Sequence, residues 1–262
     1  MQSQTEHPET ALATLPDTPA ARLPASVDAW AIFLDIDGTL LDIAETPGAV
    51  TVPGGLGADL AVLSQRTGGA LALVTGRSVA FVDRTFPDHR FHVAGLHGAE
   101  WRDASGRQFH AEPDKALGAA KLLLGEKAAA WPGVIVEDKG SAFAAHYRLV
   151  PQLEPVVRAF MESLAAGLGD RWLLQRGKSV VEIRPAGSDK GAVVERFMAS
   201  PPFQGRRPLA IGDDLTDEPM FSAVNRLGGM SVRVGEVARP SAATGLVDTP
   251  AEVREWIARV TR

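Results

Sequence analysis

An apolar run that ends in two closely spaced aspartates constrains this chain more than any other stretch. Residues 31–34 read Ala-Ile-Phe-Leu, as in a buried strand, and residues 35–39 read Asp-Ile-Asp-Gly-Thr. Alternation along a strand places Asp35 and Asp37 on the same side, and Gly38 allows a sharp turn just beyond them. Two carboxylates so close repel each other unless a cation or a proton lies between them. The stretch indicates either an ordinary strand ending in an Asp-Gly turn or a magnesium-dependent phosphoryl-transfer site.

Further polar residues stand at equivalent places later in the chain. Thr75 follows a second apolar run, Asp213 and Asp214 follow another, and Lys190 lies near an expected helix start. Each of these signals alone is weak, because such residues also serve as caps, acidic turns or surface charges. In parallel sheets, however, ligands gather outside the carboxyl ends of the strands. All four signals are therefore expected at one sheet edge, where a hydroxyl, a cation and several carboxylates suit a phosphoryl group and a divalent metal.

Strands that alternate with helices predict an α/β fold with a parallel sheet and crossover helices. The expected strands are 31–36, 70–74, 91–94, 208–212 and 229–234, and the expected helices are 56–65, 79–86, a helix opened by residues 188–190, a helix after 218, and 251–260.

The pattern changes between residues 109 and 186, where two helices and two pairs of strands follow one another. The expected elements are helices 113–130 and 151–168 and strands 134–139, 142–149, 172–174 and 179–183. We expect an α+β domain over 109–186 inserted into a core domain made of 28–108 and 187–262. The proline-containing residues 1–27 are expected to form a flexible or loosely docked tail, and they lack the basic start and apolar centre of a signal peptide.

Alternation within the inserted strands predicts two different sheet faces. Phe143, Ala145, Tyr147 and Leu149 point one way and Ala144, His146 and Arg148 the other, while Glu137 shares a face with Lys139 and Lys178 shares one with Glu182. One face would pack on the two helices and the other would carry charged groups. The polar face is either solvated, as such faces commonly are, or a binding surface.

Composition limits the classes of partner. The chain of 262 residues carries a net charge of −5, has no cysteine, and has no apolar run long enough to span a bilayer. Nucleic acid and anionic membranes prefer basic surfaces, so neither is expected as a partner. Oxygen ligands without cysteine or histidine favour Mg²⁺ over zinc or copper. We expect a cytoplasmic protein, monomeric or a small homo-oligomer.

The order of these motifs resembles the haloacid dehalogenase superfamily of aspartate-nucleophile phosphatases. Residues 35–39 match its first motif, Thr75 the second, Lys190 the third and Gly212-Asp213-Asp214 the fourth. The resemblance implies a Rossmann-like core with an inserted cap, and Mg²⁺ as cofactor. It also implies that Asp35 is the nucleophile and Asp37 the acid and base.

The remaining roles in the reaction follow from the same resemblance. Asp35, the backbone carbonyl of Asp37, and Asp213 are expected to hold the metal. Thr75 and Lys190 are expected to hold the phosphoryl oxygens. Supporting positions around them are assigned to Arg77, Asp214 and Asp217.

A closer resemblance is to trehalose-6-phosphate phosphatases, in particular the bacterial single-domain form. It is carried by residues 95–100, 146–148, 177–182 and 212–218, within a match over about 28–260. It implies hydrolysis of trehalose 6-phosphate, the final step of trehalose biosynthesis. The expected contacts to the phosphorylated disaccharide are His97, Glu100, Lys139, His146, Arg148, Lys178 and Glu182. Another sugar phosphatase, for example for sucrose 6-phosphate, and a catalytically silent binding module of the same fold remain as alternatives.

Overall fold

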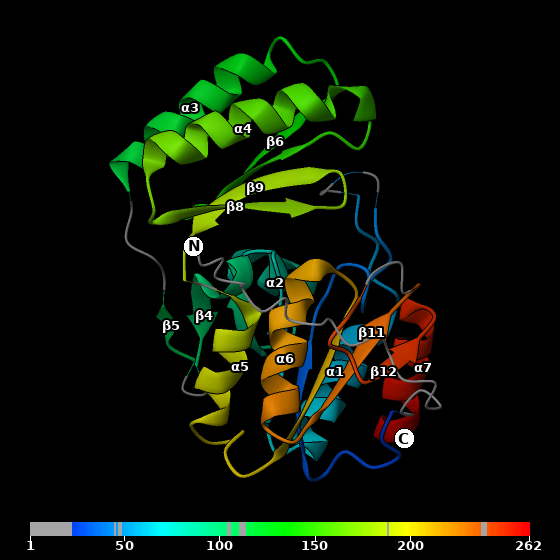
Figure 1. The fold of residues 1–262 in the computed structure, drawn as a ribbon. Coiled ribbons are helices and arrows are strands. Elements are labelled where there is room, and N and C mark those ends of the chain that lie inside the picture. The colour runs from blue at the N-terminus through cyan, green and yellow to red at the C-terminus, as the bar shows by residue number, and fades with distance from the viewer. Residues whose placement is uncertain are drawn as a thin grey trace, which may run out of the picture.

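Two β-sheets organise the computed structural model, which describes residues 23–44, 46, 49–103, 106–109, 114–187, 189–236 and 240–262. An eight-stranded sheet with helices on both faces forms the lower part of Figure 1, and a four-stranded sheet with two helices lies above it. We call these parts the core and the inserted unit. In the part of the chain that the structure describes, no helix is long and apolar enough to cross a membrane.

The sheet of the core has the strand order β12-β11-β10-β1-β2-β3-β4-β5. All pairs from β12 to β3 are parallel, whereas β3–β4 and β4–β5 are antiparallel. The bounds are β1 Trp30–Leu34, β2 Leu71–Val74, β3 His92–Gly95, β4 Glu100–Arg102, β5 Gln108–Phe109, β10 Arg207–Gly212, β11 Met230–Val234 and β12 Gly245–Val247.

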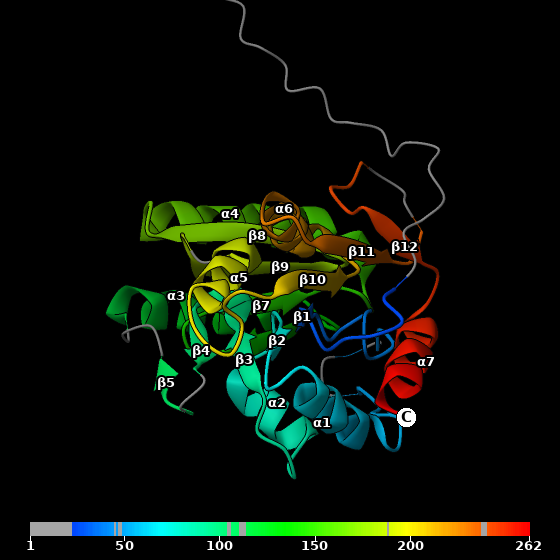
Figure 2. The ribbon, with the colours of Figure 1, turned by 90° about the horizontal axis from the view of Figure 1, so that it is seen from below.

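Helices cover both faces of this sheet, because its central strands are apolar on both sides. Helices α1 (Leu56–Arg66), α2 (Val79–Thr85) and α7 (Pro250–Thr261) bury one face, and α5 (Lys190–Met198) and α6 (Glu218–Arg226) bury the other. Figure 2 shows the two groups of helices on opposite sides of the strands. The expected α/β class with a mainly parallel sheet is confirmed.

The inserted unit is an antiparallel sheet, of order β6-β7-β9-β8, covered on one face by two helices. Its elements are α3 (Lys115–Ala128), β6 (Ile135–Asp138), β7 (Phe143–His146), α4 (Glu154–Leu168), β8 (Trp172–Gly177) and β9 (Val180–Pro185). Phe143, Ala145, Val181 and Ile183 pack against Leu117, Leu124, Val157 and Met161 of the helices. In Figure 1 the helices lie on the far side of this sheet, so its other face is turned towards the core.

Three strands of the core were not expected from the sequence. Strands β4, β5 and β12 contain three, two and three residues. Segments this short carry too few residues for a clear alternation, and their pairing with the sheet defines them. A fourth difference concerns Leu149, which was expected on the buried face but is 50% exposed, because β7 ends at His146 and the chain turns after it.

The expected tail falls mostly on residues 1–22, which lie outside the described residues. Its last part is docked on the core. Val27 is fully buried, Leu23 packs against the same apolar cluster, and Pro24 accepts a 2.8 Å hydrogen bond from the indole nitrogen of Trp256 in α7. Residues 23–27 therefore belong to the packed structure.

Candidate active site

Asp35 and Lys190 form a buried ion pair at the carboxyl end of β1. The backbone N–H of Asp35 donates to Ile211 of β10 at 3.0 Å, which fixes the residue just beyond the paired strands. Lys190, the first residue of α5, donates from Nζ to Oδ1 of Asp35 at 2.6 Å. Burial raises the pKa of Asp35 well above its ordinary value; Lys190 acts against this rise, and Asp217 and Asp213 add to it.

Asp217 organises the other side of this lysine. Its Oδ1 accepts from Lys190 Nζ at 2.6 Å, and its Oδ2 accepts from the backbone N–H groups of Asp213 and Asp214, each at 3.0 Å. Burial alone would lower the pKa of Lys190, but Asp217 and Asp35 raise it above its ordinary value. The carboxylate of Asp217 therefore holds the lysine and shapes the loop after β10.

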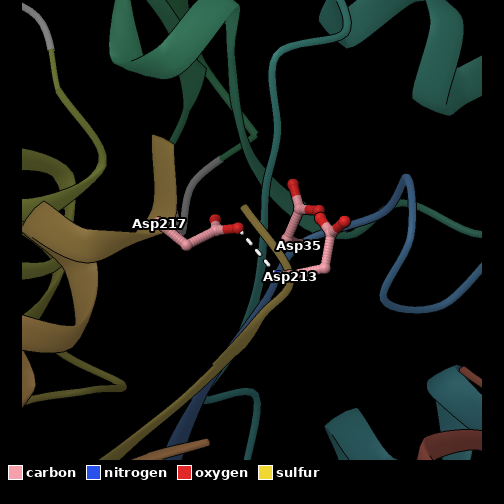
Figure 3. Close-up of side chains that lie close together, drawn as sticks. All are labelled: Asp35, Asp213 and Asp217. Carbon is pink, nitrogen blue, oxygen red and sulfur yellow. Dashed lines mark hydrogen bonds between the residues drawn. The ribbon is translucent and has the colours of Figure 1, made fainter. Parts of the chain in front are cut away.

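Three buried carboxylates from two parts of the chain meet here, as Figure 3 shows. Carboxylate oxygens of Asp35, Asp213 and Asp217 lie within 4.8 Å of one another. Both oxygens of Asp217 accept hydrogen bonds, whereas Asp35 accepts one at Oδ1 and Asp213 accepts one at Oδ2. Asp35 and Asp213 therefore have more capacity left for a cation. An oxygen-only donor set with excess negative charge fits a hard divalent cation such as Mg²⁺.

The pKa of Asp213 also reflects the closeness of these carboxylates. Burial and the neighbouring Asp217 raise its pKa to about 6, although Lys178 acts in the opposite direction. Lys178 belongs to the inserted unit and donates from Nζ to Oδ2 of Asp213 at 2.9 Å. A lysine of the inserted unit thus contacts one of the two carboxylates that fit a metal ion.

Glycine is required at the turn after Asp37. Gly38 has φ +81°, and a Cβ at this position would collide with the carboxylate of Asp213. The backbone of the first motif therefore approaches the acidic loop after β10 more closely than any side chain would permit.

Asp37 is held by Arg77. Nε and Nη2 of Arg77 donate to Oδ2 and Oδ1 of Asp37 at 2.8 and 2.7 Å. This two-point contact orients the carboxylate. Burial alone would lower the pKa of Arg77, but its pairing with Asp37 raises it.

Thr75 lies at the carboxyl end of β2, fully buried, and its hydroxyl oxygen accepts from the N–H of Arg77 at 3.0 Å. Helix α2 begins at Val79, as expected, with Ser78 as its N-cap, so Thr75 precedes the helix by several residues. The carboxyl end of a strand and a short loop, rather than a helix terminus, position this hydroxyl.

The inserted unit places its polar face over these groups. Lys139 donates to Glu182, and its Nζ also lies 3.2 Å from the carbonyl oxygen of Gly76 in the core. Burial acts to raise the pKa of Glu182, but Lys139 and His97 lower it to about 2. Nε2 of His97 lies 3.9 Å from Oε2 of Glu182, and burial lowers the pKa of this histidine.

Most of the site residues predicted from the sequence line one pocket. Its lining includes Asp35, Asp37, Arg77, His97, Lys139, His146, Arg148, Lys178, Glu182, Lys190, Asp213 and Asp214. Arg148 donates to the carbonyl of Lys178 at 3.0 Å. Core carboxylates and charged groups of the inserted unit thus share one pocket.

Glu137 and Gln175 are among the side chains that line this pocket and that sequence reasoning missed. Oε2 of Glu137 accepts from Nε2 of His146 at 2.8 Å, and Gln175 accepts from Arg184 at 3.0 Å. The shared face of Glu137 and Lys139 on one strand was the available signal. Gln175 gave none, because β8 was expected to end at residue 174 and extends to Gly177.

Glu100 is placed differently from its expected sugar contact. It is buried in β4, and its carboxylate accepts from the N–H of Val79, the first residue of α2. It does not belong to the described lining of the pocket. A negative group at a helix N-terminus is stabilised by the helix dipole, which gives Glu100 a structural reason for burial.

The fold is shared with a phosphatase of the haloalkanoate (HAD) enzyme superfamily from Bacteroides thetaiotaomicron, with a TM-score of 0.59, 17% identity and coverage of 92% of this chain and 97% of that one. More narrowly, residues 33–250 match the trehalose-phosphatase family, and the chain belongs to that family.

Comparisons with single proteins agree. The chain is 48% identical over 258 residues to a probable trehalose-phosphate phosphatase of Sinorhizobium fredii, covering 98% of this chain and 97% of that protein. It is 40% identical over 244 residues to the trehalose-6-phosphate phosphatase of Escherichia coli, covering 93% and 91%. The C-terminal domain of Candida albicans trehalose-6-phosphate phosphatase shares the fold, with a TM-score of 0.79, 24% identity and coverage of 89% and 92%.

Proposed function

We propose that this protein hydrolyses trehalose 6-phosphate to trehalose and inorganic phosphate. One observation carries the proposal: Asp35 and Lys190 share a pocket with Lys139, Lys178 and Glu182 of the inserted unit. The first pair suits the phosphoryl group, and the three charged groups suit the hydroxyls of a neutral sugar. Family membership and relatives at 48% and 40% identity support the same substrate.

In the first step Asp35 attacks the phosphorus, and the bond from phosphorus to the sugar oxygen breaks. The hydrogen bond from Lys190 reaches Oδ1 of Asp35, which leaves Oδ2 as the attacking oxygen. Asp37 gives a proton to the departing sugar oxygen. Lys190 and the hydroxyl of Thr75 hold phosphoryl oxygens and offset the charge on the transferring group.

In the second step water attacks the aspartyl-phosphate. Asp37 accepts the proton that the water loses, and the bond between phosphorus and Asp35 breaks. Phosphate leaves and both carboxylates return to their initial states. Asp37 thus serves as acid and then as base, while Asp35 is regenerated.

We propose Mg²⁺ as the cofactor, held by Asp35, Asp213 and the backbone carbonyl of Asp37. When bound, it offsets negative charge on the phosphoryl group. Asp217 and Asp214 support the loop that presents Asp213, in keeping with the hydrogen bonds from both backbone N–H groups to Asp217.

For the sugar, we propose Glu182 as an acceptor and Lys139, Lys178, His97, His146 and Arg148 as further contacts. Oε1 of Glu182 is buried and has no hydrogen-bond partner within the described part of the chain. A buried carboxylate oxygen without a donor is costly, and a sugar hydroxyl would satisfy it. The low pKa of Glu182, about 2, keeps it an acceptor at neutral pH.

The division into a core at 28–108 and 187–262 and a cap at 109–186 is part of this proposal. The contacts of Lys178 with Asp213 and of Lys139 with Gly76 support a cap that closes over the core. Closure would exclude bulk water during the transfer. The cytoplasmic location and the oligomeric state stay predictions.

A phosphate-release assay tests the proposal. Purified protein with Mg²⁺ should release phosphate from trehalose 6-phosphate much faster than from glucose 6-phosphate or sucrose 6-phosphate, and a chelator should abolish the release until Mg²⁺ is added back. Asp35→Asn should fold and bind the ester but release nothing. Release from the other two esters alone would overturn the substrate, and substantial turnover by Asp35→Asn would overturn the nucleophile.

A further inference from the structure

Arg77 lies between two carboxylates, one from the core and one from the inserted unit. Its Nε and Nη2 donate to both oxygens of Asp37, at 2.8 and 2.7 Å, while Nη1 lies 3.9 Å from Oε1 of Glu137. The guanidinium carbon lies 4.6 Å from the centre of the Phe81 ring. The ring packs on one face of the guanidinium and limits its movement in that direction.

Glu137 is held in place from its other side. Its Oε2 lies 2.8 Å from Nε2 of His146 and 4.0 Å from Nζ of Lys139, which leaves Oε1 turned towards Arg77. Lys139 in turn contacts the carbonyl of Gly76. Residues of the inserted unit thus approach the loop after β2 at two consecutive positions, Gly76 and Arg77.

The two-point contact has a consequence for the reaction. A carboxylic acid that gives a proton to a sugar oxygen needs at least one of its oxygens directed at that atom. Both oxygens of Asp37 accept from Arg77 in this structure. Arg77 takes up one lone pair of each oxygen, and opening one of the two hydrogen bonds frees that oxygen to turn towards the leaving group.

We propose that Arg77 is a positioning residue that Asp37 and Glu137 share. It orients Asp37 before the reaction, and Glu137 draws the guanidinium towards the inserted unit when the substrate is bound, which frees one Asp37 oxygen for the sugar oxygen. Contact between Nη1 and Oε1 needs a shift of about 1 Å to reach an ordinary hydrogen-bond length. The inference rests on the proposed role of Asp37 and adds that the inserted unit controls it through Arg77.

Leaving groups that differ in their need for a proton separate this role from a structural one. The sugar alkoxide must be protonated, whereas p-nitrophenolate departs without a proton. Arg77→Lys keeps the charge but loses the two-point geometry. It should lower the single-turnover rate of trehalose release from trehalose 6-phosphate by about 10-fold or more. The single-turnover rate of p-nitrophenol release, which precedes the attack of water, should change by less than about 3-fold. Asp37→Asn supplies the reference pattern for loss of the acid.

A double-mutant cycle tests the part assigned to Glu137. Glu137→Gln should lower kcat for the sugar ester about 5- to 10-fold in the wild type and have little further effect in the Arg77→Lys background, because both changes break the same connection. Lys178→Gln is the matched control. It removes another ion pair between the inserted unit and the core, and its effect should multiply with that of Arg77→Lys.

Each contrary result has a definite meaning. Equal losses on both esters would show that Arg77 has only a structural role. Independent effects of Glu137→Gln and Arg77→Lys would show that Glu137 acts only as a sugar contact. Either result overturns the inference. If Arg77→Lys does not fold, Glu137→Gln compared in the wild-type and Asp37→Asn backgrounds gives the same decision. Failure of the wild-type protein to hydrolyse the sugar ester would instead overturn the proposed function.

Discussion

Lys178 of the inserted unit donates a 2.9 Å hydrogen bond to Oδ2 of Asp213, a carboxylate of the core. The lysine stands in the turn between β8 and β9, and its side chain is 48% exposed, whereas that of Asp213 is only 8% exposed. An ammonium group and a metal ion compete for the same oxygen when they approach the same carboxylate. The contact therefore links the position of the inserted unit to the charge that Asp213 can offer a cation.

Lys178→Gln should strengthen Mg²⁺ binding in the absence of substrate. A partly exposed ion pair contributes up to about 1 kcal/mol, so we expect a gain of up to about 5-fold in affinity. Isothermal titration with MgCl₂ measures it without reference to turnover. Lys121→Gln is the control, since it removes the same charge from an ion pair with Asp138 elsewhere on the inserted unit. An equal gain in Mg²⁺ affinity in this variant would show that the change in net charge, and not the contact with Asp213, causes the effect.

Lys190→Gln should destabilise the fold strongly in metal-free buffer. The lysine is 2% exposed and neutralises Asp35 and Asp217, so its loss leaves two buried carboxylates without their cation. Breaking such a buried pair costs about 3–5 kcal/mol. Urea unfolding followed by circular dichroism measures this cost.

Two comparisons make the Lys190 result specific. Mg²⁺ should restore part of the lost stability, because a cation near Asp35 offsets the same charge. Arg226→Gln breaks an exposed pair with Glu195 and should cost less than about 1 kcal/mol. If the two variants lose similar amounts of unfolding free energy, the buried position of Lys190 does not explain its effect.

Glu182 should make stability dependent on pH in the acid range. Its pKa falls from an ordinary 4.5 to about 2 in the folded protein, where Lys139 and His97 outweigh burial. A carboxyl with a depressed pKa contributes stability that is fully present above its unfolded pKa and is lost as pH falls towards the folded value. The contribution is about 3 kcal/mol at neutral pH, disappearing between about pH 5 and 2.

Urea unfolding of the wild type and of Glu182→Gln at several pH values between 7 and 3 measures this dependence. The difference in the free energy of unfolding between the two proteins should shrink as pH falls. A difference that stays constant over this range would show that Glu182 contributes through packing alone. Glu137→Gln is a useful comparison, because the pKa of Glu137 is lowered too, with burial opposed by His146, at a more exposed position.

Much of the catalytic core could be predicted from short stretches of sequence. Asp35 and Asp213 each follow an apolar strand directly, and adjacent parallel strands bring their carboxyl ends together whatever the rest of the chain does. The same logic predicted the α/β class and the helix that starts at Lys190. Local patterns are sufficient here because adjacent parallel strands place the residues at their carboxyl ends side by side.

The contacts between the two sheets required the tertiary structure. Alternation placed Glu137 on a polar face but gave no sign that Oε1 would lie near Arg77, 60 residues earlier in the chain. Nor could it show that Glu100 accepts from the start of α2, or that both oxygens of Asp37 bind Arg77. Sequence thus determined which residue types stand at the strand ends. Packing of the inserted unit on the core decided which charges meet, because those distances depend on how the two sheets pack against each other.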